Sequence, residues 1–149
     1  MQLQSILTPG RTFHRAPGNS KKRALENTAN FICKDMQIMD DIELFNHLIA
    51  RERLGSTGLG NGIAIPHCRV KDCTTITGTL IKLEQAIDFD AIDGEPVDLL
   101  FVLLVPEEAH DEHLQALAML AEKFSNADFC QRLRDAENSE ELFATAIAE

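Results

Sequence analysis

The stretch Leu99-Leu100-Phe101-Val102-Leu103-Leu104-Val105 decides the fold class of this chain. Asp98 and Pro106 bound it, and it is far shorter than the roughly 20 apolar residues that a membrane-spanning helix needs. Both of its alternating sets of positions are apolar, which is typical of a strand covered on both faces. The sequence therefore predicts a core strand in a sheet with helices on both sides.

Patterns on either side of this stretch predict the other elements. The expected strands lie around Thr12–His14 (an edge strand, or else part of an irregular lead-in over residues 1–19), at Ile63–Ile65 before Pro66, and at Thr75–Leu83. Five helices are expected. The first begins after Ser20, the second after Asp40 or Asp41, and the third runs from about Asp111 to Phe124. The last two lie near Asp128–Asp135 and, after the N-cap candidate Ser139, near Glu140–Ala148. The whole of residues 1–149 is expected to form one α/β domain.

Helical spacing predicts which side chains of three helices face the core. The expected inward sets are Ala24, Leu25, Thr28, Ala29 and Ile32, then Ile42, Phe45, Leu48 and Ile49, and finally Leu114, Leu117, Ala118, Ala121 and Phe124.

The formal net charge of −10 is unevenly distributed along the chain. Residues 1–75 carry ten Lys or Arg and seven Asp or Glu, whereas residues 76–149 carry four and seventeen. The acidic half argues against non-specific nucleic-acid binding. The asymmetry instead predicts a dipolar surface that can orient a charged protein partner.

Four cysteines are present, Cys33, Cys68, Cys73 and Cys130, and we interpret them as reduced thiols. The spacing of Cys68 and Cys73 around a histidine segment matches no standard zinc motif, so we expect neither a metal nor a cofactor. No basic head followed by an apolar stretch marks the N-terminus as a secretory signal, so the expected location is cytoplasmic, without membrane insertion.

The segment Arg51–His67 is the most informative for chemistry, because it joins arginines, a glycine-rich loop, a short strand and a histidine. Glycines let a backbone approach a ligand closely, arginine matches phosphate oxygens, and histidine is a nucleophile with a pKa near neutrality. These residue types suit a transient phosphohistidine on His67, with donors around the new charge. The candidate phosphate-binding loop comprises Gly55, Ser56, Thr57, Gly58, Gly60, Asn61 and Gly62.

The residues of this segment disfavour three other interpretations. A lone Pro-His pair would more often be structural, but the preceding loop favours a site. Gly58-x-Gly60-x-Gly62 precedes a strand instead of joining a strand to a helix, so it is not a dinucleotide fingerprint. No Gly-Lys-Ser/Thr follows, so it is not a P-loop either.

Two further histidines lie just after the core strand, at the start of the long expected helix. His113 begins the core-facing register and His110 lies in the preceding loop, so we favour His113 as the inward side chain. A helix start also favours anions. His14 and His47 have no such context.

The stretch Gly55–His67 (GSTGLGNGIAIPH) closely resembles the phosphorylation motif of the mannitol/fructose-type IIA proteins of the bacterial phosphoenolpyruvate phosphotransferase system. Phe89–Pro106 and His113–Leu117 also resemble that family, and more narrowly its nitrogen-regulatory branch, IIA-Ntr. The resemblance covers nearly the whole chain. It implies a single IIA type-2 domain with a mixed sheet of about five strands flanked by helices on both faces.

The resemblance also implies a function and a site. Phosphoenolpyruvate would supply the phosphoryl group through a first enzyme and an HPr-like carrier, NPr. The phosphorylated residue would be His67 at Nε2, with His113 as the assisting histidine and Arg51 as the phosphate-binding arginine. Arg53 would be a possible helper. Cys68 stands where the family usually has glycine, which suggests an altered local turn and a redox-sensitive thiol; unchanged transfer after mild oxidation would dispose of the latter.

Three functions are therefore consistent with the sequence. The first is a regulatory phosphocarrier, a phosphotransferase rather than a metabolic enzyme, whose bare and phosphorylated forms bind different regulatory proteins. The second is a fructose- or mannitol-specific IIA component of a transporter. The third is a binding module in which His67 is structural.

Overall fold

Strand β6 (Val97–Pro106) runs through the middle of the sheet, and its residues from Leu99 to Val105 are fully buried. The other strands of this computed structural model, which describes residues 1–148, are β1 (Thr12–Ala16), β2 (Gly58–Gly60), β3 (Ile63–Ala64), β4 (His67–Val70) and β5 (Thr77–Ile87). They form one mixed sheet in the order β1-β5-β6-β3-β2, with β4 also paired to β6. The predicted α/β class and mixed sheet are confirmed.

The sheet has six strands because the segment before and after Pro66 is divided into two. Strand β3 runs parallel to β6 at Leu99 and Leu100, and β4 runs parallel to the same edge of β6 from Leu103 to Pro106. Proline has no backbone N–H to give to a ladder, so it interrupts the pairing. β3 and β4 therefore occupy the place of one strand, and the site lies where they meet.

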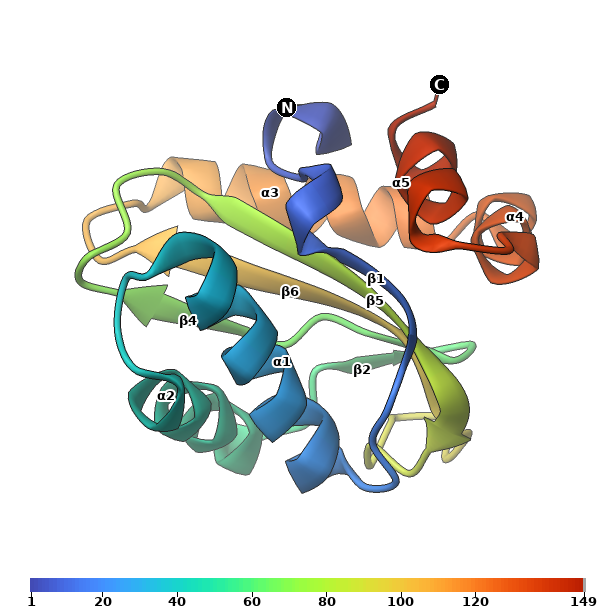
Figure 1. Ribbon diagram of the computed structural model, residues 1–149, viewed down its shortest axis with the longest axis horizontal. Helices are drawn as coiled ribbons and strands as arrows, with labels where there is room; N and C mark the ends of the chain where they lie inside the picture. The colour runs from blue at the N-terminus through green and yellow to red at the C-terminus, as the bar shows by residue number, and fades with distance from the viewer. Residues whose placement is uncertain (149) are drawn as a thin grey trace.

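Helices cover both faces of the sheet (Figure 1). One layer contains α1 (Lys21–Met36) and α2 (Asp41–Leu54), and the other contains α3 (Asp111–Phe124), α4 (Ala127–Asp135) and α5 (Ser139–Ile147), with short 3-10 turns at Leu3–Ser5 and Pro9–Arg11. Alternate residues of β6 enter two separate cores. Phe101 and Leu103 pack toward the α3 layer, and Val102 and Leu104 pack toward the α1 layer.

In the described part of the chain, side chains cap the N-termini of four of the five α-helices. Ser20 accepts a hydrogen bond from the Arg23 N–H at 3.2 Å, and Asp40 accepts one from the Glu43 N–H at 2.7 Å. The inward face predicted for α1 is confirmed, since all five of its residues are buried. The last helix begins one residue earlier than predicted: Asn138 caps α5, and the Ser139 hydroxyl instead accepts from the His14 N–H at 3.0 Å.

The inward face predicted for α2 is partly wrong. Ile42 is 70% exposed, and the buried residues are Leu44, Leu48 and Glu52, with Phe45 and Ile49 half-buried beside them. The buried face of α2 contains the carboxylate of Glu52. A search for apolar residues at helical spacing therefore selects the neighbouring face, which contains Ile42.

The register predicted for α3 is wrong by about one position for several residues. Leu114 is 67% exposed and Ala118 and Ala121 are exposed, whereas Ala116, Leu120 and Phe124 are buried. Alanine is common on both the buried and the exposed faces of helices, so the predicted and the observed buried faces of α3 have similar residue types. The prediction that His113 faces inward is nevertheless correct, because its side chain lies half-buried one turn before Leu117.

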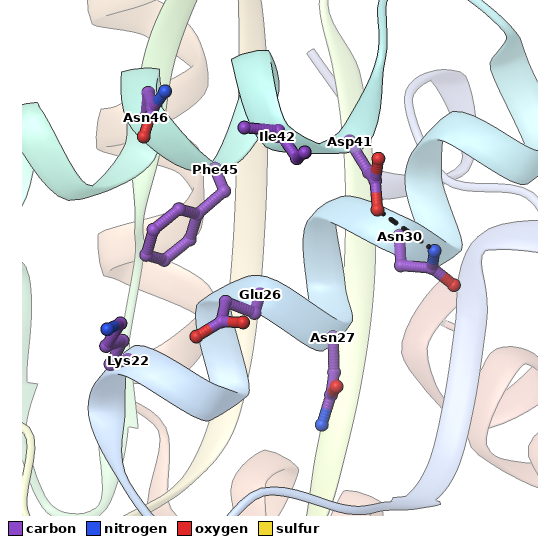
Figure 2. Close-up of a pocket in the computed structure, with 8 residues that line it drawn as sticks. All are labelled: Lys22, Glu26, Asn27, Asn30, Asp41, Ile42, Phe45 and Asn46. Atoms are coloured by element: carbon purple, nitrogen blue, oxygen red, sulfur yellow. Dashed lines mark hydrogen bonds between the residues drawn. The ribbon is translucent and has the colours of Figure 1, made fainter.

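A hollow of about 420 Å³ lies between α1 and α2, where Asn30 donates a hydrogen bond to Asp41 at 3.2 Å (Figure 2). Its lining contains none of the site residues expected from the sequence; it consists of Lys22, Glu26, Asn27, Asn30, Asp41, Ile42, Phe45 and Asn46. Within residues 1–148, no helix combines the length and apolar character needed to cross a membrane.

Candidate active site

His67 is the first residue of β4 and follows the break at Pro66. The Leu103 N–H donates to the Pro66 carbonyl at 2.9 Å, and His67 itself lies opposite Leu103 in the β4–β6 register. The strand pairing therefore fixes the backbone of His67, while its ring is half-buried and retains access to solvent.

The ring of His67 is held in one tautomer. Its Nδ1 lies 2.7 Å from the carbonyl oxygen of Ile65. A carbonyl can only accept, so Nδ1 carries the proton and the lone pair is on Nε2. Burial is the largest effect and lowers the pKa of His67; the Ile65 hydrogen bond opposes it, the positive charge of Arg51 lowers the pKa further, and Glu52 has the smallest, opposing effect. The lowered pKa favours the uncharged ring, whose lone pair is on Nε2.

His113 lies in the first turn of α3 and faces His67. The two ring centroids are 5.7 Å apart, with 66° between the ring planes. Nε2 of His113 is buried and has no hydrogen-bond partner among the described residues. Burial lowers the pKa of His113, as do the nearby His67 and Arg69. His110 precedes the helix and is exposed, as the sequence predicts.

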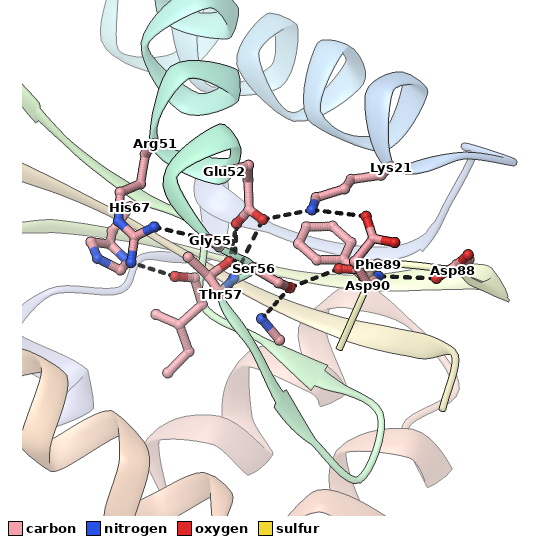
Figure 3. A network of polar contacts seen from close by, with 12 residues as sticks. Lys21, Arg51, Glu52, Gly55, Ser56, Thr57, His67, Asp88, Phe89 and Asp90 are labelled. Carbon is pink, nitrogen blue, oxygen red and sulfur yellow. Dashed lines mark hydrogen bonds and ion pairs between the residues drawn. The ribbon is translucent and has the colours of Figure 1, made fainter. Parts of the chain in front are cut away.

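Arg51 reaches the same place from the last turn of α2. Its Nη1 donates to the Gly55 carbonyl at 2.9 Å. The positive charge of Arg51 is near enough to lower the pKa of His67, in agreement with the overlap of the two side chains in Figure 3. Arg53 is exposed and lines a separate hollow of about 590 Å³ with Lys22 and Phe45. Residues two apart on a helix point in different directions, so the structure brings Arg51 to His67 and does not bring Arg53 there.

The hydroxyl groups of the predicted loop are engaged within the protein. Ser56 donates to the Phe89 carbonyl at 2.7 Å and accepts from the Gly58 N–H at 3.0 Å. The Thr57 hydroxyl and N–H both donate to the carboxylate of Glu52. With these contacts made, Ser56 and Thr57 shape the loop instead of presenting donors to a ligand.

Glu52 is the centre of a polar network that sequence reasoning missed (Figure 3). Its side chain is 2% exposed, and its carboxylate lies 2.8 Å from the Lys21 ammonium, which also lies 3.5 Å from Asp90. The Thr57 carbonyl accepts from the Ile65 N–H at 3.1 Å, and Ile65 in turn holds His67. Glu52 is thus linked to the imidazole through Thr57 and Ile65.

The second half of the loop lies away from His67. Asn61 forms the turn between β2 and β3, where its N–H donates to Asp93 at 2.8 Å and its carbonyl accepts from Arg134 at 2.9 Å. The Gly62 carbonyl accepts from the Leu99 N–H, and His67 lies opposite Leu103, so the two residues are about 13 Å apart along the extended strand β6. Gly60, Asn61 and Gly62 therefore serve the hairpin turn, and the structure does not bring them to the imidazole.

Gly58 is required by packing. A Cβ at this position would lie 2.8 Å from the Cα and Cβ of Ala91, which is closer than such atoms come. The glycine therefore lets β2 lie close to the segment after β5. Its role is to bring two parts of the backbone together, not to bring the backbone close to a ligand.

Cys68 lies within β4 opposite Leu104 and is half-buried. Its backbone φ is not in the positive region, so this position does not need glycine. Burial, with a smaller effect of Cys73, raises the pKa of the Cys68 thiol to about 12. The thiolate is the reactive form, so this environment disfavours the redox sensitivity suggested by the sequence.

The remaining histidines lie elsewhere. His14 is on β1, at the edge of the sheet opposite β3 and β4, and His47 is exposed on α2. Within residues 1–148, no three His, Cys, Asp or Glu side chains are grouped closely enough to hold a metal ion.

A family model described as "Phosphoenolpyruvate-dependent sugar phosphotransferase system, EIIA 2" matches residues 5–148. The chain belongs to this EIIA family. The "Nitrogen regulatory protein" of Pseudomonas aeruginosa is 49% identical to this EIIA protein over 99% of this chain and 96% of its own length. The protein of the same name from Escherichia coli is 42% identical over 96% of this chain and 88% of its own length.

A solved structure agrees with this assignment. The crystal structure of nitrogen regulatory protein IIA-Ntr from Neisseria meningitidis matches with a TM-score of 0.87 and 39% identity, covering 95% of this chain and 97% of that chain. The resemblance of the sequence to the nitrogen-regulatory branch is thereby confirmed.

The Glu52 network generates a prediction on stability. We expect Glu52→Ala to lower the free energy of unfolding by about 2 kcal/mol, because buried donors of Thr57 lose their acceptor. Glu52→Gln, which keeps one acceptor oxygen, should cost less. Urea unfolding measures both, with Glu43→Ala on the exposed side of the same helix as control. Equal midpoints for Glu52→Ala and the control would contradict this role.

The environment of His67 generates a prediction on pH. Because the folded protein disfavours the charged ring, its NMR titration midpoint should lie below the ordinary value of about 6.5. The unfolded chain protonates first as pH falls, so the stabilising contribution is complete above pH about 6.5 and is lost as pH falls through the folded pKa. His67→Ala should reduce this acid dependence. A midpoint above 6.5 would be inconsistent with the geometry described here.

Proposed function

We propose that this EIIA protein is a cytoplasmic regulatory phosphocarrier. It accepts a phosphoryl group on Nε2 of His67 from an HPr-like carrier, NPr, in a relay that starts from phosphoenolpyruvate. Its phosphorylation state then controls which regulatory proteins it binds. The similarity to nitrogen regulatory proteins over almost the whole chain supports the regulatory part of this proposal.

The observation that carries the proposal is the hydrogen bond from His67 Nδ1 to the Ile65 carbonyl. It leaves Nε2 as the one ring nitrogen able to attack, at a half-buried position flanked by Arg51 and His113. A purely structural histidine has no need of this combination of an uncharged ring, a free lone pair and two flanking donors.

In the proposed step, the lone pair of Nε2 attacks the phosphorus atom in line. The bond from phosphorus to Nε2 forms as the bond from phosphorus to the carrier's own donor atom breaks, and that electron pair stays with the carrier. Catalysis of such a transfer consists mainly of positioning and charge stabilisation. Arg51 and His113 supply the donors, because Ser56, Thr57 and Asn61 of the loop are already engaged.

The alternative is a fructose- or mannitol-specific IIA component of a transporter. It would use the same histidine chemistry, so the site alone does not separate the two. Mixing the phosphorylated protein with a sugar-transport IIB separates them. Rapid loss of the phosphoryl group to the IIB would favour transport, and retention of the group would favour regulation.

The first test of the proposal is phosphorylation itself. Incubation with phosphoenolpyruvate, the first enzyme and NPr should add one phosphoryl group of about 80 Da, stable to alkali and labile to acid, at His67. His67→Ala should gain no mass, whereas the exposed control His47→Ala should gain it normally. Labelling that persists in His67→Ala would refute the site, and no labelling of the wild-type protein would favour a binding module.

Arg51 and Arg53 form a matched pair for testing the guanidinium. We expect Arg51→Ala to slow phosphotransfer by about 10²-fold, because one charge-stabilising donor is lost from the transferring group. Arg53→Ala should transfer at the wild-type rate, since its side chain lines a different hollow. Quench-flow measurement gives the rates, and thermal unfolding checks that both variants fold. Equal rates in the two variants would remove Arg51 from the site.

A further inference from the structure

The side chain of Arg69 joins β4 to the start of α3 through hydrogen bonds. Its Nη1 lies 3.3 Å from the carbonyl oxygen of Pro106 at the end of β6, and 3.0 and 2.6 Å from those of Glu107 and Ala109 in the loop that leads to α3. Its Nη2 lies 3.4 Å from Nδ1 of His113. A single guanidinium thus contacts both the loop that leads into the helix and the imidazole that faces His67.

The N-terminus of α3 lacks the side-chain cap that the other α-helices have, so the contact with Arg69 matters for its position. Side chains cap the others, through Ser20, Asp40, Asn126 and Asn138. His110 at the start of α3 makes no such hydrogen bond with its side chain. The carbonyl groups that Arg69 contacts lie immediately before that position, so Arg69 holds the helix start against β4.

The same contact determines the tautomer of His113. A guanidinium has only N–H donors, so Nδ1 of His113 must accept, and the ring proton must be on Nε2. Nε2 is the buried atom that lacks a partner, on a ring 5.7 Å from that of His67. The two imidazoles therefore hold opposite tautomers, with a lone pair on Nε2 of His67 and a proton on Nε2 of His113.

This arrangement suits a phosphoryl group on His67. Phosphoryl oxygens accept hydrogen bonds, and an Nε2–H on His113 gives them a donor that has no hydrogen-bond partner among the described residues. The other tautomer would turn a lone pair toward those oxygens and repel them. Burial and the charges of Arg69 and His67 lower the pKa of His113, so the ring remains neutral and its tautomer matters.

We propose that Arg69 is a positioning residue for phosphotransfer, which keeps His113 in the Nε2–H tautomer and holds the start of α3 against the site. Its effect on rate rests on the proposed function of His67, but its effect on the tautomer does not. Arg69 acts through His113 and makes no contact with His67 itself among the contacts described above.

The first experiment measures the tautomer in the unphosphorylated protein. Two-bond ¹H–¹⁵N correlation spectra of ¹⁵N-labelled protein distinguish the two neutral forms of each histidine. We expect wild-type His113 in the Nε2–H form, and a substantial Nδ1–H population in Arg69→Met. Lys71→Met, which removes an exposed cation just beyond β4, should leave the wild-type spectrum. His113 in the Nδ1–H form in the wild type, or unchanged in Arg69→Met, would overturn the proposal.

Arg69→Lys separates charge from geometry and also provides a second variant should Arg69→Met fold poorly. Lysine keeps the positive charge but lacks the planar fork that reaches several acceptors at once. We expect Arg69→Lys to resemble Arg69→Met in the tautomer of His113. Full recovery of the wild-type tautomer in Arg69→Lys would show that charge alone suffices, which contradicts the positioning role.

The second experiment is a double-mutant cycle on the phosphotransfer rate. Arg69→Met should slow transfer on the order of tenfold in the wild-type background, as expected for a group that orients another. It should cause no further loss in a His113→Ala background, because the residue through which it acts is absent. Equal losses in both backgrounds would instead assign Arg69 to carrier docking. Failure of the wild type to accept phosphate would refute the proposed function, while the tautomer spectra would still decide the role of Arg69.

Discussion

The burial of β6 on both faces is the constraint from which the rest of the structure follows. A buried strand must pair all its backbone groups, and both edges of β6 are paired, one with β5 and the other with β3 and β4. Its side chains need a helical layer on each face. The β4 pairing holds His67, the loop that leaves β6 leads to His113, and the α1 layer carries Arg51. The three site residues meet because each is attached to this strand or packed over it.

Much of this arrangement could be predicted from the sequence, because it depends on patterns that burial imposes. The uninterrupted apolar run from Leu99 to Val105 predicts a strand covered on both faces, and turn residues and caps predict most helix boundaries. The glycine-rich approach to Pro66 and His67 marks the site because few structural segments need those residue types in that order. His113 was found because it follows the same buried strand.

The features that could not be predicted involve side chains whose burial or contacts are unusual for their residue type. Glu52 is a buried carboxylate, so it hid the inward stripe of α2 and moved the predicted face to Ile42. Ser56 and Thr57 belong to a loop that invites assignment to a ligand, yet their partners, Phe89 and Glu52, come from other elements. Arg69 was missed because an arginine in a short strand carries no signal until the fold brings the start of α3 beside it.

The unpartnered Nε2–H of His113 has a thermodynamic consequence. A buried donor left without an acceptor costs about 1–3 kcal/mol. On the proposed function, the bare protein bears that cost and the phosphorylated protein does not. A phosphoryl oxygen bonded to this Nε2–H would therefore stabilise the start of α3 relative to the bare protein.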